Sequence, residues 1–317
     1  MDIICMGEML IDFTPGKEER SYVCNPGGAP ANACIAIARN GLKTGFLGRL
    51  GNDDFGKLLK ATLEENQVEV LLPDLTDEAV TTLAFVTLYE GGERSFTFVR
   101  KPGADILLEA SDIDEEMIKN TKILHCGSFG MSANPSRDAH FHAMDLAKKN
   151  GKLVSYDINY RPMIWSFEEA KAVVDRVLPY VDLLKVSDEE LDFVGGEANI
   201  PALMKEQGIS VVIETLGSKG ARYFFNGKTG TVTGHKVKAI DATGAGDASW
   251  GGFLSRLLLG GVTTVSDLTE ELVLEALIYA NASGGLCVQK MGGIPALPTR
   301  DEVEAFVAGI GQNGTGM

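Results

Sequence analysis

Apolar and polar positions along the chain form short blocks that predict strands and helices in alternation. Runs that are apolar at nearly every position are typical of strands buried on both faces of a sheet. We place such strands at 3–13, 44–50, 68–72, 123–126, 153–158, 183–186 and 211–216. Helical spacing of apolar residues falls at 31–40, 54–66, 135–149, 167–178, 201–207, 248–259, 272–288 and 301–310. The alternation predicts a mainly parallel sheet covered by helices on both faces.

One region departs from this alternation. Residues 81–89 and 95–100 are rich in β-branched and aromatic side chains, and a Glu-Gly-Gly-Glu turn at 90–93 separates them. This pattern predicts an antiparallel hairpin, which we expect to form a separate small sheet over a binding site. We expect one domain over 1–317, with a discontinuous β lid formed by about 12–25 and 80–102. Short strands at 221–225 and 229–237 are predicted to extend the large sheet in antiparallel fashion.

The net charge of −15 narrows the classes of partner. An acidic surface argues against nucleic acid or an anionic membrane, since both require a positive field. The five cysteines are dispersed without C-x-x-C spacing, which fits buried thiols in a reducing compartment. The first residues show no secretory signal pattern, and no apolar run approaches the roughly 20 residues that cross a bilayer. We therefore expect a soluble, cytoplasmic protein.

The strongest chemical signal is the stretch D-A-T-G-A-G-D-A-S at 241–249. Its small residues form a turn that opens the predicted helix at 248–259, so that free backbone N–H groups and the positive end of the helix dipole converge. Such a point binds anions. Asp247 stands in its mouth, where an anion would repel a carboxylate, and this favours a role as proton acceptor. An Asp that only caps the helix stays open as the simpler interpretation of this stretch alone.

Polar residues that close other predicted strands mark the rest of the site, because ligands of parallel sheets bind outside the carboxyl ends of the strands. Asp12 lies near the far end of the first strand, and P-G-G-A-P-A-N at 26–32 carries a helix-start pattern. The polar residues that follow later strands are Asp157, Asn159, Arg161, Ser187, Glu190, Thr215 and Gly217. The sequence contains neither a P-loop nor a dinucleotide-binding motif.

A backbone cradle beside a carboxylate suits phosphoryl transfer. The cradle stabilises charge on the transferring group, and the acid orients and deprotonates an attacking hydroxyl. Water competes as the acceptor, so the site must exclude it, and the hairpin at 80–100 is a natural cover. Because the chain is acidic, attraction for a polyanion such as ATP must come from backbone dipoles, a few basic side chains and Mg²⁺ carried by the nucleotide.

Two signatures make the sequence resemble the ribokinase-like (PfkB) carbohydrate kinases, and among them the fructokinases. The first is P-G-G-A-P-A-N at 26–32 continuing to G-R-L-G-N-D-D-F-G at 48–56, and the second is D-A-T-G-A-G-D at 241–247. Fructokinase-like segments are G-E-M-L-I-D-F at 7–13, T-L-A-F-V-T-L at 82–88, R-K-P-G-A-D at 100–105, S-Y-D-I-N-Y-R at 155–161, K-V-S-D-E-E-L at 185–191 and G-G-I-P-A-L-P-T at 292–299. The resemblance covers nearly the whole chain. It implies an α/β fold, a ribokinase-like three-layer αβα sandwich with a mainly parallel central sheet and a small antiparallel β lid.

The resemblance also implies roles for the residues that match the family's motifs. Asp247 matches the catalytic base of the family, and Gly244, Ala245 and Gly246 match the anion hole of the family. The sugar-binding positions are Asp12, Gly27, Gly28 and Asn32, with Arg100 and Arg161 beside sugar or phosphate. The nucleotide-binding positions are Ser187, Thr215, Gly217, Gly220, Gly244, Gly246 and Asn281. Glu190 is expected to order Mg²⁺ indirectly, and Asp241 with the carbonyl of Thr243 to hold K⁺.

The implied reaction is transfer of the γ-phosphoryl group of ATP to the C6 hydroxyl of D-fructose. One alternative is a sugar-acid kinase acting on 2-keto-3-deoxygluconate, whose carboxylate Arg100 and Arg161 could hold. A second is a non-catalytic sugar-binding regulator of the same fold. The implied partners are a small-molecule sugar and ATP with Mg²⁺, and an apolar lid face would suit a homodimer.

Overall fold

The computed structural model describes residues 1–88 and 94–313. Over these residues a sheet of nine strands forms the centre, in the order β13-β12-β11-β10-β9-β8-β1-β4-β5. Its strands are β1 (Ile3–Met6), β4 (Thr44–Leu47), β5 (Glu69–Val70), β8 (Ile123–Gly127), β9 (Leu153–Asp157), β10 (Leu183–Ser187), β11 (Val211–Thr215), β12 (Gly220–Phe225) and β13 (Lys228–Thr233). Neighbouring strands run parallel from β11 to β5, while β12 and β13 add in antiparallel fashion, as predicted.

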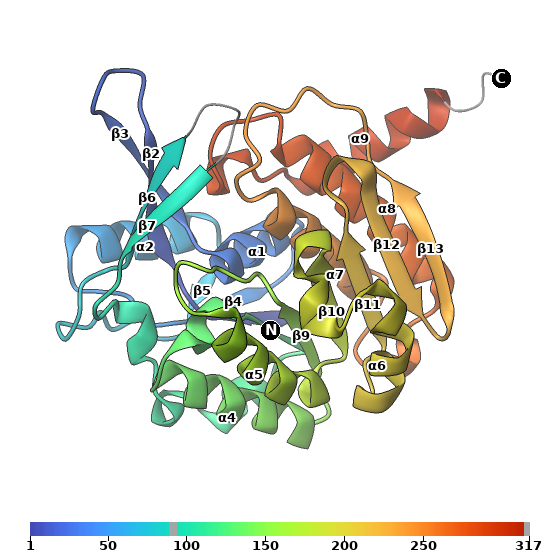
Figure 1. The fold of residues 1–317 in the computed structure, drawn as a ribbon, viewed down its shortest axis with the longest axis horizontal. Coiled ribbons are helices and arrows are strands. Elements are labelled where there is room, and N and C mark those ends of the chain that lie inside the picture. The colour runs from blue at the N-terminus through green and yellow to red at the C-terminus, as the bar shows by residue number, and fades with distance from the viewer. Residues whose placement is uncertain (89–93, 314–317) are drawn as a thin grey trace.

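Helices cover both faces of this sheet, because alternate strand residues point to opposite sides. Ile3 and Cys5 pack into one hydrophobic core, whereas Ile4 and Met6 pack into the other. The first core is covered by α1 (Ala29–Ala38), α2 (Asp54–Glu65), α7 (Ala245–Leu259) and α8 (Glu270–Cys287), with α9 (Arg300–Asn313) packed on α8. The second is covered by α3 (Glu115–Lys119), α4 (Ser136–Lys149), α5 (Phe167–Val177) and α6 (Ile200–Gln207) (Figure 1). This is the predicted three-layer sandwich, and none of the described helices could span a membrane.

A smaller sheet stands beside the large one, at the left of Figure 1. Within the described residues it has four strands in the order β3-β2-β6-β7, namely β2 (Leu10–Pro15), β3 (Tyr22–Gly27), β6 (Leu83–Leu88) and β7 (Arg94–Val99). The predicted hairpin is β6 and β7, and its turn at 90–93 lies outside the described residues. The pairs β2–β3 and β6–β7 are antiparallel, as predicted for the lid, but β2 runs parallel to β6, so the lid sheet is mixed. Between β2 and β6 the chain contributes β4 and β5 to the large sheet, and this long connection allows β2 and β6 to pair in parallel.

The predicted strand at 3–13 is two strands in two different sheets. β1 ends at Met6, and Gly7 has a φ of 146°, a conformation that side chains rarely adopt. A Cβ at Gly7 would also lie 2.8 Å from the Cγ of Pro30. The chain therefore turns at Gly7 and enters the lid at Leu10, which leaves Glu8 between the two sheets. The apolar residues on both sides of Gly7 and Glu8 made the two strands resemble one, because both are buried where they meet.

Candidate active site

A cavity of about 260 Å³ lies where the N-termini of α1 and α7 meet the lid and the ends of β9 and β10. Five of the predicted side chains line it: Asp12, Asn32, Asn159, Arg161 and Asp247. The predicted glycines Gly28, Gly244 and Gly246 line it as well, together with Thr243. Residues at 12, 32, 161 and 247 are thus brought together although they are far apart in the chain.

The N-terminus of α7 keeps backbone donors for a ligand. Its N-cap is Gly244, with a φ of 75°, and no side chain of residues 1–88 or 94–313 caps it. The N–H groups of Gly246 and Asp247 lie in the first turn, where a helix offers no carbonyl partner, and both residues line the cavity. Ala245 differs, because its N–H donates to Ala242 O at 3.2 Å and the residue is absent from the lining. Of the predicted anion-hole residues, Gly244 and Gly246 thus line the cavity, next to Asp247, and Ala245 does not.

Asp247 reaches from this turn to α1. Its Oδ2 accepts a hydrogen bond from Asn32 Nδ2 at 2.7 Å. Burial raises the pKa of Asp247, while the Asn32 hydrogen bond and the charge of Lys185 act in the opposite direction. An Asp engaged by Asn32 across the cavity does not merely cap its own helix. The carboxylate of Asp247 therefore joins α7 to α1 at the cavity.

Asp12 comes from the lid strand β2 and sits among the glycines of the Pro26–Asn32 motif. A Cβ at Gly27 would lie 2.3 Å from Asp12 Oδ2, so only glycine leaves room for this carboxyl. Burial raises the pKa of Asp12 to about 7, and the charge of Asp247 adds to the effect while Arg161 opposes it. Asp12 and Asp247 therefore face one cavity from the lid and from α7.

The start of α1 is closed by a residue that the sequence analysis passed over, Glu8. Its Oε1 accepts the N–H of Ala29 at 3.1 Å, and its Oε2 has no partner among the described residues. Glu8 is 3% exposed, lines the cavity, and has its pKa raised by burial to about 8. Its place in G-E-M-L-I-D-F, an acid inside an apolar run, was the available signal.

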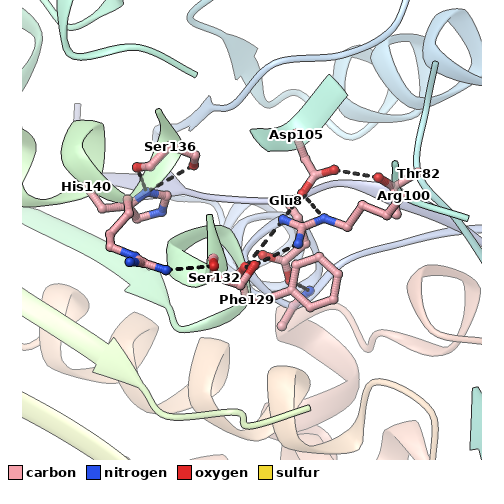
Figure 2. A network of polar contacts seen from close by, with 10 residues as sticks. Glu8, Thr82, Arg100, Asp105, Phe129, Ser132, Ser136 and His140 are labelled. Atoms are coloured by element: carbon pink, nitrogen blue, oxygen red, sulfur yellow. Dashed lines mark hydrogen bonds and ion pairs between the residues drawn. The ribbon is translucent and has the colours of Figure 1, made fainter. Parts of the chain in front are cut away.

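Arg100 does not line the cavity. Figure 2 shows it in a network with Asp105, Phe129 and Ser132. Its Nε donates to Asp105 Oδ2 at 2.8 Å and its Nη1 to Ser132 Oγ at 2.7 Å. The guanidinium also lies over the Phe129 ring, 4.4 Å from its centroid. Phe129 itself lines the cavity, so Arg100 supports the wall. The expectation that Arg100 reaches into the sugar site is not met by this geometry, because Asp105 engages its charge.

Apart from Gly244 and Gly246, the predicted nucleotide residues lie outside this cavity, at the ends of β10 and β11, at the start of β12 and on α8: Ser187, Thr215, Gly217, Gly220 and Asn281. Asn281 Nδ2 donates to Val232 O at 2.9 Å, which ties α8 to β13. Glu190 is buried, and its two oxygens accept from Tyr160 N at 2.7 Å and Ser187 N at 2.9 Å. It therefore joins the loops that follow β9 and β10.

Asp241 holds the turn that leads into α7. Its Oδ1 accepts from Thr243 N at 2.9 Å and from Thr243 Oγ1 at 2.7 Å, and its Oδ2 accepts from Gly292 N at 3.0 Å. The predicted K⁺ position is thus a turn pinned to the loop at 292. No group of three or more His, Cys, Asp or Glu side chains within 1–88 and 94–313 could by itself hold a metal ion.

Lys185 forms an ion pair with Asp157, which was among the strand-closing residues expected at the site, whereas Lys185 itself was not predicted there. They lie opposite each other on β10 and β9, with Lys185 Nζ 2.7 Å from Asp157 Oδ2. Lys185 lines the cavity, and a Cβ at Gly246 would lie 3.5 Å from its Nζ. Burial alone would lower the pKa of Lys185, but the charges of Asp157, Glu190 and Asp247 raise it above its usual value.

The fold and the cavity bring a buried carboxylate, the N-terminus of a helix and a small sheet together around a polar pocket. Comparison with known proteins supplies the family. Residues 1–300 match the model of the pfkB family carbohydrate kinases. The chain is 41% identical over 313 residues to fructokinase-1 of Oryza sativa subsp. japonica, covering 95% of this chain and 96% of that protein. The chain belongs to the pfkB family of carbohydrate kinases.

Solved structures agree with this assignment. Fructokinase with bound ATP from Xylella fastidiosa superposes with a TM-score of 0.90 at 30% identity, covering 98% of this chain and 99% of that one. A double mutant of the fructokinase from Vibrio cholerae O395, in its fructose, ADP and potassium ion bound form, has a TM-score of 0.88 at 36% identity, covering 96% and 98%.

Proposed function

We propose that this protein is an ATP-dependent fructokinase, which transfers the γ-phosphoryl group to the C6 hydroxyl of D-fructose. The observation that carries the proposal is the meeting of Asp12, Asn32 and Asp247 with the uncapped amides of α7 in one cavity. Relatives that share about 40% identity over nearly their full length are fructokinases. A sugar would occupy the side of Asp12 and Asn32, and the phosphates would occupy the side of α7.

Asp247 is the proposed base. It takes the proton of the C6 hydroxyl as the bond from that oxygen to the γ-phosphorus forms. The bond between the γ-phosphorus and the bridging oxygen breaks, and ADP leaves with the electron pair. The N–H groups of Gly246 and Asp247 stabilise the negative charge on the moving phosphoryl group. Asp12 and Asn32 orient the sugar, since a sugar hydroxyl left unpaired in a cavity costs binding energy.

Mg²⁺ and K⁺ are proposed cofactors. Mg²⁺ would come with the nucleotide and neutralise charge on its phosphates. Glu190 can act on it only indirectly, because both of its oxygens already accept backbone N–H groups. For K⁺, the turn at Asp241 and Thr243 offers a carboxylate and a carbonyl oxygen next to α7. The nucleotide base would lie beyond the cavity, toward Thr215, Gly217, Gly220 and Asn281.

The experiment that tests the proposal is a substrate panel under saturating Mg-ATP, with D-fructose, 2-keto-3-deoxygluconate and other sugars in a coupled assay for ADP. We expect a clear preference for fructose in kcat/KM. The sugar-acid alternative needs a cation for the carboxylate, and only Arg161 of the two predicted arginines lines the cavity. Preference for the acid would overturn the proposed substrate. ADP release that no sugar stimulates would favour the non-catalytic regulator.

Assembly and location complete the proposal. We propose one domain with a β lid that pairs with the lid of a second subunit. Tyr22 and Val23 on β3 and Val99 on β7 are large apolar side chains exposed on the lid. A cytoplasmic location fits the five free thiols at Cys5, Cys24, Cys34, Cys126 and Cys287. Sedimentation of the protein with and without charged substitutions at Val23 tests the dimer.

A further inference from the structure

Lys185 carries a buried ammonium group that is only partly hydrogen-bonded. It is the third residue of β10, it is 6% exposed, and it lies among apolar strand residues. Burying an ammonium group is costly unless it is paired. The pairing in the described part of the chain is a single hydrogen bond, from Nζ to Asp157 Oδ2 at 2.7 Å. An ammonium group has three N–H donors, so this bond leaves two of them for another acceptor.

The direction of the amine identifies where that acceptor would be. Lys185 lines the cavity with Gly244, Gly246 and Asp247, and its Nζ lies 3.5 Å from where a Cβ of Gly246 would be. The ammonium group thus stands close to the N-terminus of α7, which is itself the positive end of a helix dipole. The carboxylates of Asp157 and Asp247 lie near this point, and the amides of α7 with two N–H groups of Lys185 remain available there to a further anion.

The charge of the cavity points the same way. Its lining contains the acidic side chains of Glu8, Asp12 and Asp247, and the basic side chains of Arg161 and Lys185. A polyphosphate would be repelled by the acids, so local positive charge is needed where the phosphoryl group passes. Of the two basic side chains that line the cavity, Lys185 is the one whose Nζ lies next to Gly246, in the first turn of α7.

We propose that Lys185 binds the γ-phosphoryl group of ATP, opposite the amides of Gly246 and Asp247, and stays bound to it during transfer. This inference rests on the proposed kinase function and names a further catalytic residue for it. Asp157 is a positioning residue, because its carboxylate holds the amine at the cavity and keeps it charged. An ion pair that served only to join β9 and β10 would not need to line the cavity.

The same strand offers a matched control. Asp182 directly precedes β10 and pairs with Lys148 of α4, Nζ to Oδ1 at 2.9 Å. Asp182 is buried like Asp157, but Lys148 is 41% exposed in its side chain and does not line the cavity. Lys148→Met therefore removes an ion pair at the opposite end of β10 and should leave nucleotide binding and turnover unchanged.

The test compares the wild type, Lys185→Met and Lys148→Met for binding of AMP-PNP and of ADP at fixed Mg²⁺, by calorimetry without turnover. We expect Lys185→Met to bind AMP-PNP at least about tenfold more weakly, with ADP affinity within about threefold, since a lost charged hydrogen bond is of this size. kcat should fall at least about 10²-fold, while KM for the sugar changes little. Lys148→Met should match the wild type.

Removal of Lys185 alone leaves Asp157 as an unpaired buried charge, which can unfold the protein. The double variant Lys185→Met/Asp157→Asn removes both charges, and the same loss of AMP-PNP binding is expected in it. An unchanged ratio of AMP-PNP to ADP affinity in a folded variant would overturn the inference, whatever its thermal stability. If the wild type phosphorylates no sugar but still prefers AMP-PNP through Lys185, the proposed function and the catalytic role of Lys185 both fail, and only its contact with the γ-phosphoryl group stands.

Discussion

The cavity lies between two helix N-termini that start alike but differ in the backbone N–H donors that they offer a ligand. α1 and α7 both start at a glycine with positive φ, Gly28 at 117° and Gly244 at 75°, and neither cap uses the side chain of its own N-cap residue. In α1 the first N–H donates to Glu8, and the next residue, Pro30, has none. In α7 the amides of Gly246 and Asp247 stay open to the cavity.

This difference divides the site into two halves. A helix N-terminus attracts anions through its free N–H groups as well as its dipole. In α1 the N–H of Ala29 already donates to Glu8, and Pro30 has no N–H to donate. That end therefore suits a neutral, hydroxyl-rich ligand. The open end of α7 suits phosphate. Asp247 is joined to Asn32 of α1 at the boundary, where a proton would leave the sugar and a phosphoryl group would arrive.

The largest expected effect comes from removing the base at this boundary. Asp247→Asn keeps an oxygen that can accept the Asn32 hydrogen bond, but it cannot take a proton. We expect kcat to fall about 10²- to 10⁴-fold, with fructose binding retained. Steady-state kinetics and calorimetry with fructose measure the two quantities. Asp138→Asn, on an exposed acid of α4, is the control, and near full activity in Asp247→Asn would end the assignment of the base.

Alanine at the two N-cap glycines separates the halves. At Gly244 a Cβ would lie 3.1 Å from Gly293 Cα, and at Gly28 it would lie 2.6 Å from Glu8 O. Each substitution also forces a side chain into a positive φ, at about 1–2 kcal/mol. We expect Gly244→Ala to raise KM for ATP or lower kcat by about tenfold or more. Gly28→Ala should instead raise KM for fructose. Equal effects of both variants on both substrates would contradict the division.

Much of this fold and half of this site could be predicted from the sequence. Alternating blocks identify the sheet, and D-A-T-G-A-G-D and P-G-G-A-P-A-N identify the ends of α7 and α1. Short-range spacing sets these features, so they are readable from one chain. Gly7 and Glu8 mark the break between β1 and β2 only weakly in the sequence, since the strands on either side are both buried and apolar.

The missed residues share another cause. Lys185 and Glu8 lie within apolar stretches, and what they do depends on partners that are remote in sequence, Asp157 on the neighbouring strand and Ala29 on α1. Strand order decides such pairings, and strand order is a property of the whole sheet. Arg100 illustrates the reverse case, because Asp105 engages the charge that was expected to serve the substrate.

A smaller effect is expected on the pH dependence of the base. The hydrogen bond from Asn32 and the charges of Lys185 and Arg161 lower the pKa of Asp247, whereas burial and Asp157 raise it. The base works in its ionised form, so kcat rises with pH through this pKa. Asn32→Ala removes one lowering contribution. We expect the acid limb of kcat to move to higher pH, so that the loss of activity is larger at pH about 6 than at pH about 8.

Asn40 of the segment after α1 provides the control for that shift. Its side-chain amide is buried, donates to Ala36 O at 2.8 Å and accepts a hydrogen bond from the hydroxyl of Tyr279. Neither Asn40 nor Tyr279 lines the cavity. Asn40→Ala should lower thermal stability and leave the acid limb in place. An acid limb that stays unchanged in Asn32→Ala would show that Asn32 does not act on the base.

The smallest effect on activity, and one mainly on stability, is expected at the closed end of α1. Burial raises the pKa of Glu8 from 4.5 to about 8. Between these values the folded state keeps a proton that the unfolded chain has lost, so Glu8 costs stability increasingly as pH rises from about 5 to 8. Glu8→Gln keeps an acceptor for Ala29 N–H without that cost. We expect it to be more stable than wild type at pH about 9, by at most about 5 kcal/mol, and similar at pH about 5.

Urea unfolding of both proteins across this pH range measures the difference, with Glu65→Gln on an exposed face of α2 as the control whose difference from wild type stays flat. Because the amide still closes the end of α1, KM for fructose should change by less than about tenfold, the size of one weak hydrogen bond. If the Glu8→Gln variant becomes less stable than the wild type as pH rises, Glu8 is ionised in the folded protein. In that case the end of α1 would carry a charge, and its contrast with α7 would rest on that charge rather than on used donors.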